Sequence, residues 1–261
     1  MARRRRTGLI VTGVVVVALV GAFFIADAAA RSYGEGLAED EIAARLPAAV
    51  SGDVSVAIGG FSVIGQYLTG SFERVDLTAP ELTFDGAPAA VHIRATGVPT
   101  DTTQPIEQVS GTIDLGETAL NTLLAAANED QGTAATGPVQ AGATELRLGT
   151  DAVTYAGSVA IFGFDIGYQA TATPSATADS LVLTPTGAEL STDAGSLNVD
   201  DLLQLVLGEE PVSICVAQYL PQGVTLSGVN VTPERARITL ESSTLTLTEQ
   251  SLTTLGTCSP A

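Results

Sequence analysis

From Val54 onward, apolar and polar residues alternate with a period of two along many short stretches of this sequence. The segments Val54–Ile58, Leu82–Phe84 and Val91–Ala95 each place apolar side chains at every second position. Successive side chains of a β-strand point to opposite faces, so this pattern predicts half-buried strands with one solvated face. Such strands are typical of antiparallel sheets, and we therefore expect a sizeable antiparallel sheet.

The same alternation predicts further strands at Val75/Leu77, Gly111–Leu115, Leu146/Leu148, Val153/Tyr155, Leu181/Leu183, Gly195–Val199, Val224/Leu226, Val229/Val231, Ile238/Leu240 and Leu245/Leu247. The dipeptide Asp85-Gly86 lies between two of the strands and predicts a tight hairpin turn. Two segments rich in small residues, 128–142 and 171–179, are predicted to be loops, the second because it contains Pro174.

Three segments have helical spacing of apolar residues instead. They run from Ser32 to Val50, from Glu117 to Asn128 and from Val199 to Leu207. Acidic residues in the first turn of the last two suit the positive end of a helix dipole. The predicted fold class is α+β, with these helices lying on the apolar face of the sheet.

The N-terminus predicts export. Arg3 to Arg6 precede an uncharged run over residues 7–26, and Asp27 is the first acidic residue. A run of about 20 apolar residues suits a transmembrane helix, whereas a small-residue site near Ala26–Ala30 suits cleavage of a secretory signal. In either case the arginines stay inside and the body is exported. We therefore divide the chain into residues 1–30, an anchor or signal, and residues 31–261, an exported domain.

The exported part is strongly acidic. From Asp27 onward the chain contains seven basic and 29 acidic residues, a formal charge of −22, and the whole chain has no lysine. Such a charge repels nucleic acid, which we exclude as a partner. It also repels anionic head groups, so any lipid binding would depend on apolar enclosure, although acidity alone also keeps an exported protein soluble.

The two cysteines, Cys215 and Cys258, both lie in the exported part. An oxidising compartment favours their pairing, and no C-x-x-C motif or neighbouring histidine suggests a thiol catalyst. We predict a disulfide between them.

The residues offer little for catalysis. The single histidine, His92, falls on the polar side of a predicted strand, and no G-x-S-x-G motif accompanies it. One histidine and two paired cysteines leave too few ligands for zinc, and no calcium-binding loop is present. We expect no catalytic residue, no metal and no cofactor.

Apolar residues are the more prominent feature. Phe61, Ile64 and Leu68 share one side of a glycine-flanked helical turn, and Phe162, Phe164 and Ile166 belong to the most hydrophobic strand. Ordinary core packing explains such residues, but a sheet face that helices fill only partly would accept acyl chains. The predicted lipid-binding residues are Phe61, Ile64, Leu68, Phe84, Leu124, Phe162, Phe164, Ile166, Leu203 and Leu207.

Several segments resemble a known family. Val56–Phe61, Leu68–Leu77 and Leu82–Gly86, together with Leu220–Val224 and the two cysteines, are similar to the LmeA-like family of actinobacterial envelope proteins. The resemblance implies a phospholipid-binding protein that supports assembly of mannan-type glycolipids. It also implies a curved sheet wrapped around helices, as in tubular lipid-binding folds.

We therefore expect a non-enzymatic protein that captures acyl chains of a phospholipid or glycolipid in an apolar groove. It would lie at the cytoplasmic membrane through its N-terminal segment, or be secreted if the signal is cleaved. Arg74 and Arg94 are candidate head-group contacts, although cross-strand ion pairs are an alternative role for both. The rival hypotheses are a non-catalytic envelope scaffold and a carbohydrate hydrolase that uses two carboxylates.

Overall fold

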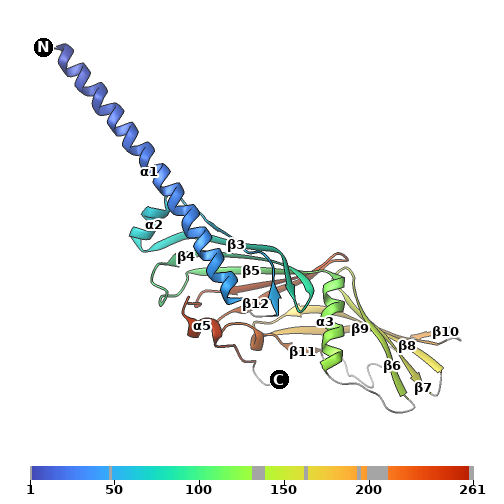
Figure 1. Ribbon diagram of the computed structural model, residues 1–261. Helices are drawn as coiled ribbons and strands as arrows, with labels where there is room; N and C mark the ends of the chain where they lie inside the picture. The colour runs from blue at the N-terminus through green and yellow to red at the C-terminus, as the bar shows by residue number, and fades with distance from the viewer. Residues whose placement is uncertain are drawn as a thin grey trace.

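The computed structural model describes residues 2–46, 49–130, 139–161, 164–192, 195–198 and 211–258. These residues form two antiparallel sheets, a long N-terminal helix that projects from the body, and shorter helices between and after the strands (Figure 1). The predicted α+β class and the antiparallel arrangement are confirmed.

The first sheet contains most of the N-terminal strands and the last two strands of the chain. Its order is β1-β3-β4-β5-β13-β12, with β2 paired to β3. The bounds are β1 Val50–Ser51, β2 Ser55–Ile58, β3 Ser71–Phe84, β4 Ala87–Pro99, β5 Gln108–Leu115, β12 Thr225–Val231 and β13 Ala236–Ser242. The strands predicted from alternation in these ranges are confirmed, except that those predicted at Val224/Leu226 and Val229/Val231 form one strand, β12, which begins at Thr225.

The hairpin between β3 and β4 turns at Asp85 and Gly86, as predicted. Both residues have positive φ, 48° and 82°, which is the conformation of the tight turns that match the strand twist. The two strands predicted at Val75/Leu77 and Leu82/Phe84 are one continuous strand, β3. Its register shifts between Ala79 and Leu82, and the intervening proline, which has no N–H to donate, fits such an irregularity.

The second sheet has the order β10-β9-β8-β7-β6, and β11 pairs with β9. The bounds are β6 Val139–Leu148, β7 Val153–Ile161, β8 Phe164–Ala176, β9 Ser180–Thr192, β10 Gly195–Asn198 and β11 Val212–Cys215. Both predicted loops are partly wrong, because β6 already begins at Val139 and β8 continues to Ala176. Pro174 is tolerated because it pairs with Leu183 of β9, two residues beyond the last pair with β7, Val153↔Ala172.

The helices are α1 Ala2–Arg45, α2 Val63–Thr69, α3 Glu117–Asp130 and α5 Glu249–Thr253, with a short 3-10 turn, η1, at Ala217–Tyr219. The segment predicted from Ser32 to Val50 is the last part of α1, and Val50 instead begins β1. The helix predicted from Glu117 is confirmed as α3, whereas the one predicted at 199–207 lies outside the described residues.

The strand predicted at Leu245/Leu247 is wrong. Only an isolated bridge between Thr246 and Pro105 forms there. The chain then enters α5, whose first turn is capped by the Thr248 side chain accepting from the Ser251 N–H.

Within the described part of the chain, no helix holds an apolar stretch long enough to cross a membrane. The membrane-spanning segment predicted over residues 7–26 stays a prediction, because the side chains of residues 7–18 lie outside the described part of the chain.

The sheets do not wrap around the helices as the predicted architecture required. Two separate sheets stay open within the described residues, and α3 lies where they meet (Figure 1). At this junction Leu120 of α3 and Val153 of β7 pack against the buried residues Leu148, Val231 and Ala236. The first helix, α1, lies beside β2 and not on an apolar face.

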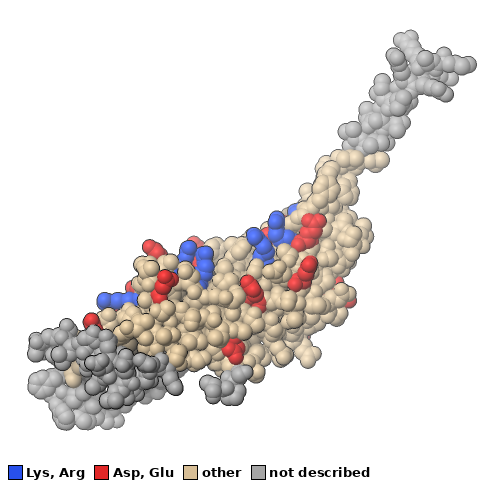
Figure 2. Space-filling view, turned by 180° about the vertical axis from the view of Figure 1, so that it is seen from behind, with Lys and Arg blue, Asp and Glu red and all other residues tan. Residues whose placement is uncertain are grey.

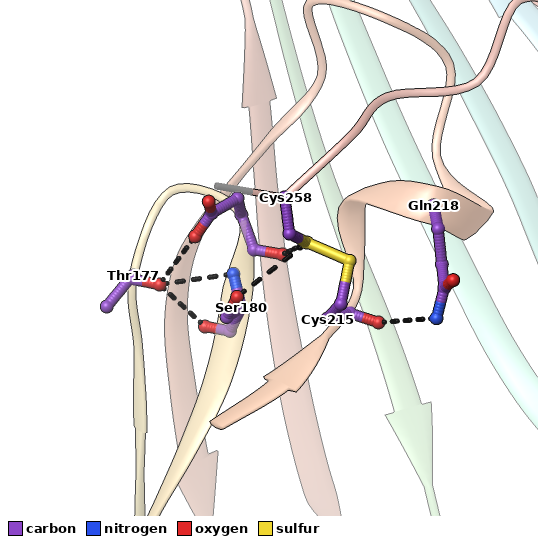
Figure 3. Close-up of a disulfide and its surroundings, with 6 residues drawn as sticks. Thr177, Ser180, Cys215, Gln218 and Cys258 are labelled. Atoms are coloured by element: carbon purple, nitrogen blue, oxygen red, sulfur yellow. Dashed lines mark hydrogen bonds between the residues drawn. A yellow bond between two sulfur atoms is a disulfide. The ribbon is translucent and has the colours of Figure 1, made fainter. Parts of the chain in front are cut away.

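The predicted disulfide between Cys215 and Cys258 is confirmed, with the two Cα atoms 5.9 Å apart. It joins the end of β11 to the C-terminal segment (Figure 3). Beside it, the Ser180 N–H donates to the Thr177 hydroxyl at 3.1 Å and closes the turn between β8 and β9.

Candidate functional site

One face of the first sheet is apolar from edge to edge. Directly paired residues in antiparallel strands point to the same side, so Leu77↔Ile93 and Val91↔Ile113↔Ile238 belong to one surface. We call this surface the apolar face, and it comprises Val75, Leu77, Val91, Ile93, Val109, Ile113, Ile238 and Leu240.

The apolar face is covered at one end and along both outer strands, where Val56 (paired with Leu77) and Leu226 (paired with Leu240) are 6% and 4% exposed. Where α3 and its neighbours pack, Leu82, Ala89 and Val231 are buried, at 5%, 4% and 2% exposure. All eight residues of the apolar face, by contrast, are only half-buried. Large apolar side chains in the middle of a sheet are usually buried, so this surface can still take up apolar material.

A gap in the side chains lies at the centre of the apolar face. The row that crosses the sheet through Leu77 and Ile93 continues to Gly111 and then to Leu240. A Cβ placed on Gly111 would lie 3.7 Å from Ile93 Cγ1 and 3.8 Å from Leu240 Cβ, which are ordinary contacts. The glycine is itself buried and contributes no side chain between these two large ones.

The opposite face of the first sheet holds both predicted head-group contacts. Asp76 accepts from Arg94 Nε at 2.6 Å and pairs with Arg74 Nε at 3.0 Å. Arg94 on β4 therefore forms the cross-strand ion pair that was the alternative to head-group binding, whereas Arg74 pairs with Asp76 within the same strand, β3. Both arginines remain about half exposed, at 52% of the side chain.

A second carboxylate on that face is also paired with arginine. Arg237 donates to both oxygens of Asp114, at 2.6 and 2.7 Å. These hydrogen bonds hold the pKa of Asp114 below its usual value, with the charges of Arg237 and Arg235 acting in the same direction. His92 shares this face, and its Nδ1 lies 3.1 Å from the Thr78 hydroxyl.

Helix α1 docks on the open edge of β2 through its side chains. The Val56 N–H donates to Glu39 at 2.7 Å, and the Ile58 N–H donates to Glu35 at 2.8 Å. Arg31, one turn earlier, donates to the carbonyl oxygens of Ile58 and Gly60. Residues four apart lie on one side of a helix, so these side chains line up along the strand and bond its backbone as a neighbouring strand would.

The same side of α1 also fixes α2. Asp27, one turn before Arg31, is only 4% exposed. Its carboxylate accepts from the Ser62 hydroxyl at 2.7 Å and from the Ile64 N–H at 2.9 Å. The Ser62 bond first, and then the Ile64 bond, lower the pKa of Asp27.

A buried glutamine completes this junction. Gln66 donates to the carbonyl oxygens of Gly59 and Ser62, at 3.0 and 3.1 Å, and accepts from the Glu73 N–H at 2.6 Å. It thereby ties the end of β2, the start of α2 and the start of β3 together.

The predicted lipid contacts around α2 point away from the body. Phe61 and Leu68 are 74% and 79% exposed, and Ile64 is half-buried. The inward side of α2 is formed by Val63 and Gln66 instead. Phe61 and Leu68 therefore do not belong to the apolar face.

The other predicted contacts are scattered. Phe84 ends β3, roughly 40 Å along the strand from α2. Leu124 on α3 and Ile166 on β8 are half-buried, and Phe164 is the first residue of β8. Phe162, Leu203 and Leu207 lie outside the described residues. Their role in lipid binding stays a prediction.

Sequence reasoning missed the residues that organise this region. Three acidic residues of α1 were considered only for their charge, namely Asp27, Glu35 and Glu39. Their spacing of four or eight residues places them on one side of a helix. Gly111 was missed because its place beside Ile93 and Leu240 depends on strand pairing.

Two clefts near the C-terminal segment are lined mostly by polar residues. One is lined by Glu107, Gln108, Glu241 and several threonine and serine residues. Another is lined by Gln222, Gln250 and further hydroxyl side chains. These two clefts offer mainly hydrogen-bonding groups, whereas a third, lined by Ala217, Val224 and Leu255 among others, is more apolar.

Comparison with known proteins identifies the family. Searches among curated proteins and among solved structures gave no significant match. The LmeA-like phospholipid-binding family matches residues 25–241. This range includes α1 from its middle, the docking side chains of α1, the whole of α2 and every strand of the apolar face. The chain therefore belongs to the LmeA-like phospholipid-binding family.

Proposed function

We propose that the protein binds phospholipid by laying acyl chains against the apolar face of the first sheet. The observation that supports this most is that the eight residues of that face, on the inner strands, remain half-buried although one end of the face and both outer strands are buried. Each methylene removed from water contributes about 0.8 kcal/mol, so about ten methylenes outweigh repulsion from the acidic surface, which salt screens beyond about 8 Å.

The proposed setting is the cell envelope, outside the cytoplasm. The disulfide between Cys215 and Cys258 supports an oxidising compartment. Within the envelope the protein would deliver or present lipid to the assembly of mannan-type glycolipids, and it would act by binding and not by catalysis. Head groups would stay at the rim of the sheet, in water. Arg74 and Arg94, half-exposed and paired with Asp76, could contact a head group only if it reached the opposite face.

Gly111 provides a direct test. The Gly111→Val variant adds a branched side chain between Ile93 and Leu240, where a Cβ makes only ordinary contacts. Excluding roughly two methylenes costs about 1.6 kcal/mol, so we expect about tenfold weaker binding. Delipidated protein is incubated with dioleoyl-phosphatidylglycerol vesicles and re-isolated, and the bound phospholipid is quantified by mass spectrometry.

Gly228→Val is the matched control. Gly228 pairs with Thr239, on the opposite face of the same sheet, and its added Cβ would lie 3.9 Å from the nearest atom. Both variants place valine in a strand, where it is favoured. Equal lipid binding by both variants, with circular dichroism confirming that both fold, would exclude the apolar face. Absence of bound lipid from the parent chain would favour the scaffold hypothesis instead.

A further inference from the structure

A cluster of large apolar side chains is exposed where α1 meets α2. We call this cluster the tip, and it comprises Leu19, Val20, Phe23, Phe24, Ile25, Phe61, Tyr67 and Leu68. Their exposed fractions run from 42% at Phe23 to 79% at Leu68. Soluble domains rarely leave so many neighbouring aromatic and aliphatic side chains in water, so the tip is suited to contact an apolar partner.

The tip is one surface although it comes from two elements. The rings of Phe24 on α1 and Phe61 before α2 meet edge to face, with centroids 5.7 Å apart. Directly behind them, buried Asp27 joins α1 to Ser62 and Ile64 at the start of α2. The polar contacts of the junction are thus turned inward, and the apolar side chains are held outward in a fixed arrangement.

Charge indicates what the tip contacts. Residues 7–26 are uncharged, and in Figure 2 the described part of α1 that projects from the body has no charged side chain. Four arginines, Arg3 to Arg6, lie on the same helix about 20 Å beyond Leu19. Aromatic side chains favour the interface of a phospholipid bilayer, apolar side chains favour its hydrocarbon layer, and arginines favour its anionic head groups. An uncharged apolar surface with aromatic rings and arginines further along the helix has this order.

The acidic body supports the same orientation. Seven basic and 29 acidic residues follow the uncharged run, so most of the surface is repelled by an anionic bilayer. The tip is a place where the described body can approach such a bilayer without that penalty. A protein partner would not need the neighbouring arginines.

We propose that the tip inserts into the interfacial layer of a phospholipid bilayer and that α2, with Phe61 and Leu68, is a wedge that seats the body on the membrane. This inference rests on the proposed function, since it names the membrane from which the lipid is taken. It concerns contact at the bilayer surface, through side chains of α2 as well as of α1.

The chain has no tryptophan, so one introduced indole reports its own surroundings without background. The full chain with Leu68→Trp is mixed with vesicles of phosphatidylglycerol and brominated phosphatidylcholine in equal parts. We expect a blue-shifted emission and loss of most of its intensity through bromine quenching. The matched control is Tyr219→Trp, on η1 after β11, because Tyr219 is 74% exposed. Its emission should stay red-shifted and unquenched.

A second pair of variants measures the energy of the contact. Phe61→Asp combined with Leu68→Asp should weaken vesicle association roughly tenfold or more, because two large apolar side chains lose their burial. Tyr219→Asp should not. Equal quenching at positions 68 and 219, or no quenching at either, overturns the proposal. Self-association that depends on protein concentration and is lost in Leu68→Asp would assign the tip to a second copy instead.

The two proposals fail separately. If Gly111→Val lowers phospholipid capture but the indole of Leu68→Trp is not quenched, the apolar face stands and the wedge is overturned. If the indole is quenched but capture does not depend on Gly111, the wedge stands and the proposed binding face is overturned.

Discussion

At the scale of single residues, Asp27 is the most informative side chain. It is a carboxylate with 4% exposure, and such a group is tolerated only because it is hydrogen-bonded. Its two bonds to Ser62 and Ile64 replace the water it has lost and hold α1 to α2. The neutral form of the side chain would accept these bonds less strongly.

We predict that Asp27→Asn loosens the junction in a pH-dependent way. The pKa of Asp27 is lowered in the folded protein, so its stabilising contribution is present above the unfolded value of about 3.9 and is lost as pH falls through the folded value. Hydrogen exchange should show a lower protection factor for the Ile64 amide in Asp27→Asn at neutral pH. The difference from the parent protein should shrink when the pH falls well below 4.

Asp40→Asn, which changes an exposed carboxyl on the same helix, serves as the control and should leave Ile64 protected. A difference between Asp27→Asn and the parent that stays constant down to low pH would show that the charge of Asp27 does not hold the junction.

Predictions about single residues succeeded where they depended only on the residue's own backbone conformation or on the compartment. The Asp85-Gly86 turn and the cysteine pair follow from backbone conformation and from compartment, and both are confirmed. Ion pairs with nearby acids were expected for Arg74 and Arg94, but that Arg94 shares Asp76 with Arg74 depends on the register of β3 and β4. The exposure of Phe61 and Leu68 was not predicted, because an apolar residue in a short helix gives no sign of facing outward.

At the scale of elements, two helices cover strand edges in the same way. On β2 the amides of Val56 and Ile58 donate to Glu39 and Glu35 of α1. On β6 the Leu148 N–H donates to Glu117 of α3 at 2.9 Å. Leu146 of the same strand exchanges two hydrogen bonds with Asn121 of α3, at 2.7 and 2.8 Å.

On both helices the side chains that bond the strand are four residues apart in sequence. The strand residues that they bond are two residues apart, so the two spacings match along the edge. A strand edge with open N–H groups invites pairing with another chain, and these side chains occupy it. The arrangement therefore orients each helix along its sheet and protects the edge at the same time.

We predict that Glu35→Ala combined with Glu39→Ala exposes the edge of β2. Two amides lose a charged acceptor, which costs roughly 1–3 kcal/mol in the free energy of unfolding. Hydrogen exchange should show loss of protection at Val56 and Ile58 while the centre of β4 stays protected. Light scattering should show a greater tendency to associate.

Glu41→Ala is the control for the same helix. Glu41 accepts from Arg45 on the exposed side of α1, and exposed pairs of this kind contribute little. If Glu41→Ala reduced the protection of Val56 and Ile58 as much as the double variant, general weakening of α1 would explain the result.

The elements themselves were largely predictable, but their assembly was not. Alternation located the strands, and helical spacing located α3, because both patterns arise from neighbours in sequence. The division into two sheets depends on pairings such as Ile113↔Ile238, far apart in the chain. The loop predicted around Pro174 failed because proline was judged without the sheet position that accommodates it.

At the scale of the whole molecule, the C-terminal segment fastens the two sheets to each other. It contacts the first sheet's connection between β4 and β5, where the Ile106 N–H donates to Leu245 and the Leu247 N–H donates to Thr102. Further along, Gly256 donates to Leu220, and Cys258 is bonded to Cys215 at the end of β11 in the second sheet. The family match ends at residue 241, so this segment lies beyond it.

We predict that removing the disulfide releases this segment and weakens the joint between the sheets. The bridge spans a separation of 43 residues, for which the chain-entropy contribution is about 4 kcal/mol. The double variant Cys215→Ser, Cys258→Ser should unfold at a lower denaturant concentration by circular dichroism, and a reductant should shift the parent protein to the same midpoint. The variant itself should not respond to the reductant, which separates loss of the bridge from other effects of the reagent.

Hydrogen exchange should locate the change in residues 245–258 and at Ile106 before it reaches β3 and β4. An unchanged midpoint, with the bridge shown to be absent by mass spectrometry, would mean that backbone bonds such as Gly256 to Leu220 hold the segment without it.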